Sequence, residues 1–216
     1  METSMDAAVE IAPEEALFDG GAKWRQIMDG ARAVFLGDGF DGASMSDVAR
    51  AAGVSKGTLY VYFDSKEQLF EALIRDERKQ QAERLVFPGH PGDAREFLRE
   101  FGVRLIEMMT RPESIKHLRV IIAATAKFPN LGRAFYEAGP CHGARKLAAQ
   151  LIKLRESGQL EFDDAERAAR HFVDLAKSGV FNPVLFGARE TPSRADVAAS
   201  VEAALDVFMR AYGRGD

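Results

Sequence analysis

Residues 44–63 read SMSDVARAAGVSKGTLYVYF, and the expected fold of the chain follows first from this stretch. Ser44 can cap a short helix, because serine accepts a hydrogen bond from a free backbone N–H of the first turn. Gly53 then allows a left-handed turn, and Ser55 supplies a second cap. A second short helix follows over residues 56 to about 63. Two short capped helices joined by such a turn have the form of a helix-turn-helix.

The second helix of this motif has one apolar side and one side that suits contact with DNA. Leu59 and Phe63 are four residues apart, and we expect both to point inward. The other side carries a lysine, a glycine, a threonine and two tyrosines at positions 56, 57, 58, 60 and 62. Helix-turn-helix proteins place the first turn of this helix in the major groove, where ammonium and hydroxyl donors reach phosphates and base edges. The motif therefore indicates DNA binding.

The sequence on both sides of the motif has helical periodicity. Apolar residues from Trp24 to Phe35 recur every three or four positions, which predicts a first helix ending at Gly37-Asp38-Gly39. Ser65 and Gln68 have the spacing of a capping box and open a longer helix toward Leu85. A joint rich in proline and glycine follows near residue 88. We expect further helices over 93–111, 113–127, 130–157, 163–182 and 193–212, so that the chain is all-α with about nine helices.

The composition fits an intracellular globular protein with unevenly distributed charge. The 216 residues are 46% hydrophobic and carry a net charge of -4. Residues 1–21 hold six acids and no lysine or arginine, so we expect a mobile acidic tail before a nearly neutral body. Cys141 is the only cysteine, which excludes an intrachain disulfide. We find no membrane-spanning run and no signal peptide, and therefore expect a cytoplasmic protein without membrane contact.

Three motifs between Ile27 and Leu73 carry a family resemblance. They are Gly39-Phe40-x-Gly42-Ala43-Ser44, then Val48-Ala49-x-x-Ala52-Gly53-Val54-Ser55-Lys56-Gly57-Thr58-Leu59-Tyr60, and Tyr62-Phe63-x-Ser65-Lys66-Glu67-x-Leu69. This stretch, about a quarter of the chain, closely resembles the DNA-binding domain of the TetR family of transcriptional regulators. The resemblance implies an all-helical homodimer. Its first three helices would bind DNA, a fourth would link them to the rest, and a C-terminal domain would hold the dimer and bind a small molecule.

The resemblance also assigns DNA contacts to the matching positions. It implies phosphate contacts at the start of the second helix, at the two tyrosines of the third and at the first lysine of the fourth, with base edges nearest to the start of the third. The family often has an aromatic or polar residue where this chain has Val61, which either touches a thymine methyl group or only packs. The complete set is Ser44, Ser46, Lys56, Gly57, Thr58, Tyr60, Val61, Tyr62 and Lys66.

The C-terminal half contains His117-Leu118-Arg119-Val120-Ile121-Ile122, Lys127-Phe128-Pro129-Asn130-Leu131 and Phe135-Tyr136-Glu137-Ala138-Gly139-Pro140. It looks like the AefR-type C-terminal domain found in part of this family. The Gly139-Pro140 pair predicts a kink that opens space beside Phe135 and His142. Apolar residues nearby either line an effector pocket or belong to the core. The candidate pocket residues are Phe101, Leu105, Met108, Leu118, Ile122, Phe135, His142 and Phe172.

The last two helices carry apolar and small residues at helical spacing. Paired with the same helices of a second subunit, they would form a four-helix interface. The same residues could instead face the core of their own protomer. The candidate interface residues are Leu175, Gly179, Val201, Leu205 and Phe208.

Other kinds of site have less support in the sequence. Residues 37–42 spell G-x-G-x-x-G, but no strand precedes them and two acids there would repel a pyrophosphate. The four histidines lack the spacing of metal ligands, and Cys141 beside His142 is more typical of an inert buried thiol. No paired carboxylates, catalytic triad or cofactor loop indicates an enzyme. We therefore expect no metal, no cofactor and no catalytic residue.

Taken together, these patterns predict a ligand-responsive repressor that binds a palindromic DNA operator as a homodimer. A small apolar or amphipathic effector would release it. We expect a tail at 1–21, the DNA-binding domain at 22–68, and an effector-binding and dimerisation domain at 69–216. The alternative is a non-specific architectural DNA-binding protein or a helical protein-contact module. Operator binding that survives competitor DNA would separate the two.

Overall fold

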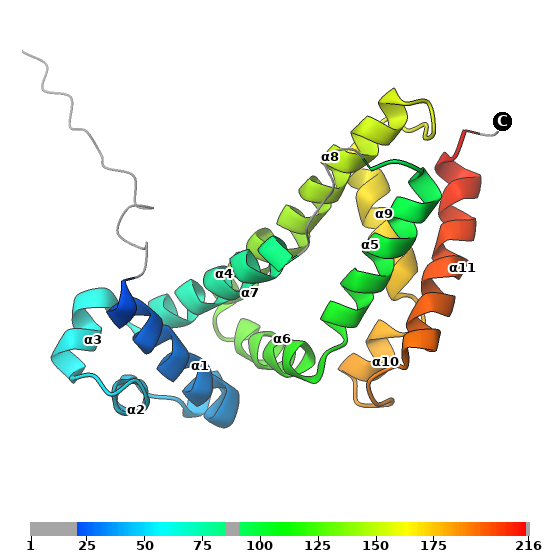
Figure 1. Cartoon of the computed structure of the whole chain (residues 1–216). Helices are drawn as coiled ribbons and strands as arrows, with labels where there is room; N and C mark the ends of the chain where they lie inside the picture. Colours follow the sequence, from blue (N-terminus) through cyan, green and yellow to red (C-terminus); the bar gives the residue numbers. More distant parts are fainter. Residues whose placement is uncertain (1–20, 85–90, 215–216) are drawn as a thin grey trace, which may run out of the picture.

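The chain folds into helices throughout the part that its computed structural model describes, residues 21–84 and 91–214. Figure 1 shows an all-α architecture, as predicted. An isolated bridge between Leu160 and Gly213 is the only β-type pairing among these residues. Within the same ranges, no helix is both long and apolar enough to cross a membrane. The predicted acidic tail and most of the joint near residue 88 lie outside the described residues.

Eleven α-helices and one π-helical segment occupy the described residues, in the order shown in Figure 1. Their bounds are α1 (Ala22–Gly42), α2 (Met45–Ala51), α3 (Lys56–Tyr62), α4 (Lys66–Arg84), α5 (Ala94–Met109), α6 (Pro112–Thr125), α7 (Pro129–Tyr136), the π-helical segment η2 (Glu137–Cys141), α8 (His142–Glu156), α9 (Ala165–Lys177), α10 (Phe181–Leu185) and α11 (Arg194–Tyr212).

Helices α2, α3 and α4 begin where the sequence predicts, because serine caps them. The side-chain oxygens of Ser44, Ser55 and Ser65 each accept a hydrogen bond from the backbone N–H three residues on, at 3.2, 3.0 and 3.2 Å. Gly53 has the positive φ of 62° that the turn between α2 and α3 requires. The predicted helix-turn-helix is therefore present.

Three helical stretches differ from the predicted ones. The first helix continues to Gly42, with a kink at Gly39, whose φ is 72°. The predicted helix 130–157 is interrupted by η2, because Pro140 cannot donate to the helical hydrogen-bond ladder and the turn widens around it. The predicted helix 163–182 ends at Lys177, since Gly179 adopts a φ of 79°, and α10 follows. These breaks raise the count above nine.

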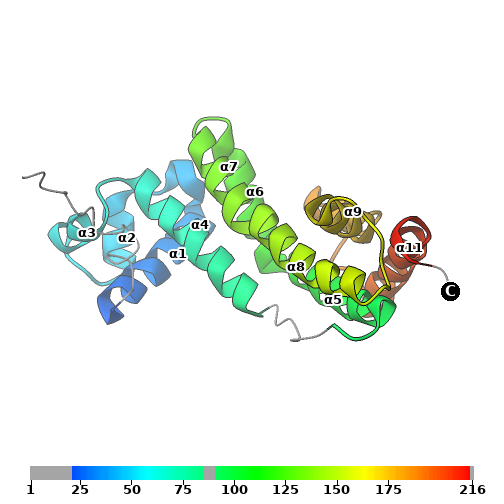
Figure 2. The ribbon, with the colours of Figure 1, turned by 90° about the horizontal axis from the view of Figure 1, so that it is seen from above.

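Two large hydrophobic cores hold most of the helices together, and a third, small cluster joins α6 to α10. The first core joins α1 to α4 with one side of α6 and α7, through residues such as Phe35, Leu59 and Leu131. The second joins α5, α8, α9 and α11 around Phe172 and Phe208. We call α1–α3 the head. Figures 1 and 2 show the head at one end of the molecule and α11 at the other, with α4 leading away from the head.

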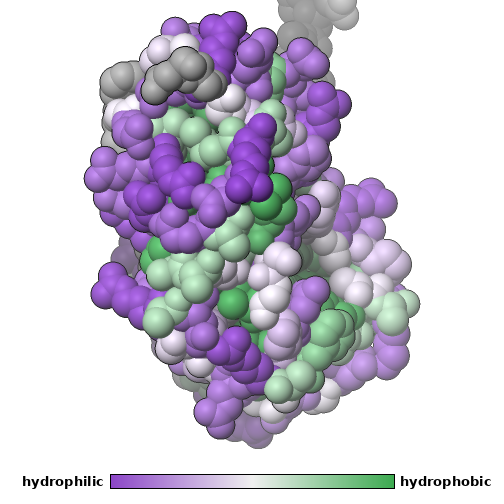
Figure 3. All heavy atoms as spheres, turned by 90° about the vertical axis from the view of Figure 1, so that its right-hand side faces the viewer, coloured by the Kyte–Doolittle hydropathy of each residue, from purple (hydrophilic) through white to green (hydrophobic). Residues whose placement is uncertain are grey.

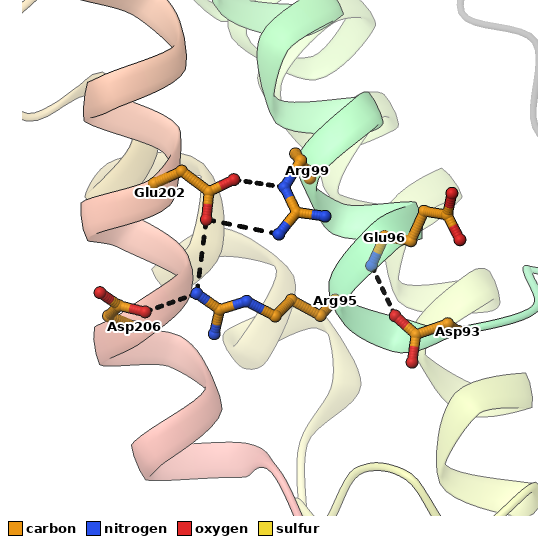
Figure 4. A network of polar contacts seen from close by, with 6 residues as sticks. All are labelled: Asp93, Arg95, Glu96, Arg99, Glu202 and Asp206. Atoms are coloured by element: carbon orange, nitrogen blue, oxygen red, sulfur yellow. Dashed lines mark hydrogen bonds and ion pairs between the residues drawn. The ribbon is translucent and has the colours of Figure 1, made fainter.

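On the outer side of the second core, a network of ion pairs joins α5 to α11 (Figure 4). Arg95 lies 2.5 Å from Asp206 and 3.4 Å from Glu202, which also pairs with Arg99. Hydrogen bonding from Arg99, and then its charge and that of Arg95, hold the pKa of Glu202 below its usual value. The contribution of these pairs to stability is therefore present above the ordinary carboxyl pKa and is lost as the pH falls below it.

Candidate DNA-binding surface

Helix α3 presents the predicted contact residues on an open face of the head. Leu59 and Phe63 are buried in the first core, as the spacing predicts. Lys56 and Gly57 are exposed, and the Tyr60 side chain is 50% exposed. The other predicted members lie around them: Thr58 and Tyr62 are half-buried, while Ser44 and Ser46 are exposed at the start of α2.

Val61 is the most exposed of the large apolar residues on α3. Its side chain is 82% exposed, so packing within the protomer does not account for it. An exposed valine between polar neighbours fits the methyl group of a thymine in the major groove. Of the two roles considered for Val61, the exposed position favours the contact with DNA.

The start of α1 lies beside the turn of the motif and adds cations to this surface. The Gln26 side chain donates a hydrogen bond of 2.6 Å to the carbonyl oxygen of Ala52. Lys23 and Arg25 flank Trp24 in the sequence, and both are exposed. Neither residue belongs to the sequence motifs, so neither was predicted as a candidate phosphate contact. The partner of Gln26 is 26 positions away, and no local spacing shows that α1 reaches this turn.

Close packing of α1 on α2 sets the position of this surface. A β-carbon placed on Gly30 would lie 2.6 Å from the backbone nitrogen of Ala52 and 2.7 Å from its Cα. Only glycine allows this approach, because backbone atoms cannot move aside as a flexible side chain can. Gly30 is therefore a determinant of the α1–α2 geometry.

Lys66, predicted to contact phosphate, has a different role within the protomer. Its ammonium group donates hydrogen bonds to the carbonyl oxygens of Phe40 and Ala43, at 2.8 and 3.0 Å. It also lies 4.5 Å from the centre of the Phe40 ring. These carbonyls are at the end of α1, where a cation satisfies the last acceptors and complements the helix dipole. The structure thus makes Lys66 a helix-capping residue.

This difference gives a testable prediction that compares two lysines. Lys56→Met is expected to lower the slope of log Kd against log salt by about one, because it removes an exposed cation from the DNA-facing start of α3. Lys66→Met is expected to leave that slope unchanged and to destabilise the protein by about 2 kcal/mol, because two charge-assisted hydrogen bonds are lost. Fluorescence anisotropy at several salt concentrations and urea unfolding measure the two quantities. A lower slope for Lys66→Met would restore it to the phosphate contacts.

The predicted effector-pocket residues do not converge on one cavity. Phe101, Leu105 and Phe172 are buried in the second core, and Met108 packs against it. Leu118 packs on a separate small cluster and Phe135 on the first core, while the Ile122 side chain is 50% exposed. His142 is half-buried at the start of α8. Core packing accounts for Phe101, Leu105 and Phe172, and which of the eight residues would contact an effector stays a prediction.

The predicted interface residues need a similar correction. Val201, Leu205 and Phe208 are fully buried against α5 and α9 within one protomer, so they present no surface to a partner. Leu175 is half-buried, and Gly179 is exposed in the turn after α9. The opposite side of α11 is open to solvent instead. Figure 3 views this side of the molecule and shows hydrophobic side chains among polar ones.

In residues 21–84 and 91–214, no group of three or more His, Cys, Asp or Glu side chains is arranged to hold a metal ion. A recess of about 10 Å³, the size of one water molecule, lies between α1, α4 and α6 and includes Arg32, Glu77 and His117 in its lining.

The head, with its exposed helix α3, has the architecture of a helix-turn-helix DNA-binding protein. Comparison with known families agrees. The family described as "Bacterial regulatory proteins, tetR family" matches residues 27–73. The family described as "AefR-like transcriptional repressor, C-terminal domain" matches residues 96–214.

Individual relatives are similar along most of their length. The transcriptional repressor Rv1474c of Mycobacterium tuberculosis is 27% identical over 80% of this chain and 87% of its own. The solved Flavonoid-responsive Regulator FrrA is 34% identical, with a TM-score of 0.81 over 91% of this chain and all of that one. A TetR regulator from Agrobacterium tumefaciens is 28% identical, with a TM-score of 0.72 over 90% and 96%.

The chain belongs to the TetR family of bacterial transcriptional regulators, with an AefR-like C-terminal domain. It is a DNA-binding transcriptional regulator of the repressor type, in a family where ligand-responsive regulation is typical. Its homologues are regulators, not enzymes. The architectural or protein-contact alternative is not favoured by these matches.

Proposed function

We propose that a homodimer of this protein represses transcription in the cytoplasm by binding a palindromic operator with its two heads. The observation that carries the proposal is the open face of α3, where Lys56, Gly57, Tyr60 and Val61 are exposed together. A two-fold symmetric dimer would place two such helices in successive major grooves. Within each protomer we assign residues 22–68 to DNA binding and 69–216 to dimerisation and effector binding.

Roles for individual residues follow from their exposure. We assign base-edge contacts to Lys56, Gly57 and Thr58, and a thymine contact to Val61. Ser44, Ser46, Tyr60 and Tyr62 would position the head on the phosphates, aided by Lys23 and Arg25. Lys66 is left out of this set because its ammonium group caps α1.

The experiment that tests this function is selection of binding sites from random duplex DNA with the purified full-length protein. An enriched inverted repeat is expected, with an affinity that survives excess competitor DNA. Absence of any enriched motif, with a protein shown to be folded and dimeric, would contradict the proposal and favour non-specific binding.

The effector in our proposal is a small apolar or amphipathic molecule bound between the helices that follow the head. Leu118, Phe135 and His142 remain candidate contacts, since each is half-buried and not sealed in a core. Burial, then the charges of Lys146 and Arg145, lower the pKa of His142, so its ring is neutral at pH 7 and can donate or accept a hydrogen bond. Because the similar regulator FrrA is named flavonoid-responsive, flavonoids are the first probes for release from a selected operator.

For the homodimer, we assign the outward side of α11 to the interface. Ala195, Ala199 and Ala203 are exposed at a spacing of four residues, and the next position, Val207, is 51% exposed. Such a stripe of small apolar residues lets two helices approach closely.

Val207→Lys is expected to shift the protein from dimer to monomer, because it places a charge at the position of the largest apolar side chain of this stripe. Sedimentation equilibrium measures the change. Ile122→Lys is a matched control, since Ile122 on α6 has nearly the same exposure, 50%. If the Val207→Lys dimer is as stable as the wild-type dimer, or if both variants weaken the dimer equally, the assignment of the interface to this side of α11 is contradicted.

A further inference from the structure

A buried carboxylate on α4 links α1 to α6. The Glu77 carboxylate accepts a hydrogen bond from Nε of Arg32 on α1 at 3.0 Å, and its second oxygen lies 3.2 Å from Nδ1 of His117 on α6. The side chains of Glu77 and His117 are only 11% and 16% exposed. One acid thus contacts a head helix and a helix beyond the head at the same time.

The mostly apolar surroundings of the Glu77 carboxylate strengthen its polar contacts. The water-sized recess between α1, α4 and α6 is lined by these three polar side chains and otherwise by apolar ones, among them Phe35, Leu73 and Val120. An ion pair in such a place is weakly screened, and Arg32 is the cation that pairs with Glu77 there, although Arg32 also pairs with Asp29 and Asp76. The contact can therefore hold the three helices in one arrangement.

The residue next to Glu77 anchors the other side of α4. The Arg78 guanidinium lies 4.5 Å from the centre of the Phe135 ring on α7. A β-carbon at Gly139 in η2 would lie 3.0 Å from Cδ of Arg78, so this segment fits closely against the same side chain. Consecutive residues of α4 thus contact α1 and α6 on one side and α7 and η2 on the other.

We propose that Glu77 is a positioning residue: by joining Arg32 to His117, it fixes the head against α6 and so sets the distance between the two heads of the dimer. Neither the family resemblance nor the predicted site residues include any of these three side chains. The inference rests on the proposed function, because the distance between heads matters only for a dimer that binds two half-sites together.

Several charges act on the His117 ring in this arrangement. Burial lowers the pKa of His117, the Glu77 carboxylate raises it, and the positive charges of Arg78, Arg32 and Lys116 lower it. Asp29 and Asp76 lie 2.7 and 3.8 Å from Arg32 and share its charge. The ring is therefore neutral at pH 7, and its titration reports directly on whether the Glu77 contact exists.

The test uses Glu77→Gln and compares two DNA duplexes, the selected full operator and the same operator with one half-site scrambled. Affinity for the full operator is expected to fall about tenfold, whereas affinity for the single half-site stays unchanged. Discrimination against operators whose half-sites are one base pair closer or farther apart is expected to weaken as well. Glu71→Gln is the matched control, because Glu71 is on the same helix and pairs along it with Arg75.

A second pair of variants covers the case in which Glu77→Gln does not fold. His117→Leu removes the polar contact and is expected to reproduce the loss, whereas His117→Asn keeps an N–H near the position of Nδ1 and is expected to stay close to the wild type. In the free protein, NMR titration of His117 is expected to give a lower pKa in Glu77→Gln than in Glu71→Gln, because the carboxylate that raises it is gone.

The outcomes separate the two proposals. If the wild type prefers the full operator and Glu77→Gln keeps that preference, or if affinities for both duplexes fall together, the positioning role is overturned. An unshifted His117 pKa in Glu77→Gln overturns the contact itself. If the wild type shows no preference for the full operator, the proposed function fails first, and the positioning role with it.

Discussion

Gly30→Ala is expected to abolish tight operator binding. The added methyl group would overlap the backbone of Ala52, at 2.6–2.7 Å, so α1 and α2 must separate. Overpacking of this kind lowers the free energy of unfolding by about 1–3 kcal/mol. Because the clash is with backbone atoms, we expect Gly30→Ala to be at or above the upper end of this range. Because α2 and α1 together hold α3, the separation displaces the contact face. We expect a lower urea midpoint and at least a roughly hundredfold weaker operator complex, since about 2.7 kcal/mol corresponds to that factor.

The control for Gly30→Ala is on the same helix. A β-carbon on Gly37 would meet no atom within 4 Å. Gly37→Ala is therefore expected to stabilise α1 by about 0.5–1 kcal/mol through helix propensity alone, with unchanged operator affinity. Equal stability of the two alanine variants would show that the approach of α1 to α2 is less close than described.

Phe172→Ala is expected to cost about 3–5 kcal/mol of the free energy of unfolding. The Phe172 ring is fully buried, with its centre 5.4 Å from that of Phe208 and 6.3 Å from that of Phe101. A β-carbon at Gly102 would lie only 3.1 Å from its Cζ, so α5 is fitted against this ring as well. Truncation leaves a cavity where α5, α9 and α11 meet. Equilibrium urea unfolding measures the loss.

This prediction separates a core residue from a pocket residue. If the Phe172 ring lined an open effector cavity, its truncation would change the free energy of unfolding little. The main change would then be in the response to ligand. Phe172→Leu, which keeps most of the volume, is expected to cost clearly less than Phe172→Ala. A cost below about 1 kcal/mol for Phe172→Ala would return this residue to the candidate pocket.

Local features of the fold could be predicted from the sequence. The serine caps at 44, 55 and 65 depend on atoms three residues apart, and all three hydrogen bonds are present. Leu59 and Phe63 are buried because the helical period places them inward. The all-α class follows from the same short-range patterns, and the family match agrees with the predicted helix-turn-helix.

Contacts between distant segments could not be predicted in this way. Lys66 looks like a surface cation in the sequence, but its partners at 40 and 43 become neighbours only after α1 and α4 pack. The stripe Val201, Leu205 and Phe208 has the same periodicity whether it faces its own core or a partner, and periodicity cannot choose between them. Glu77 and His117 carry no local signal of their contact.

The sharing of α4 between the head and the rest has a consequence for protein engineering. Leu69, Phe70, Leu73 and Ile74 complete the core that contains α1–α3, and α6 and α7 add Ile121 and Leu131 to it. A chimaera that joins residues 22–68 to another regulator would leave this core open on one side. Exchange of DNA specificity is therefore better served by replacing the surface residues of α3 alone, with the native α4, α6 and α7 left in place.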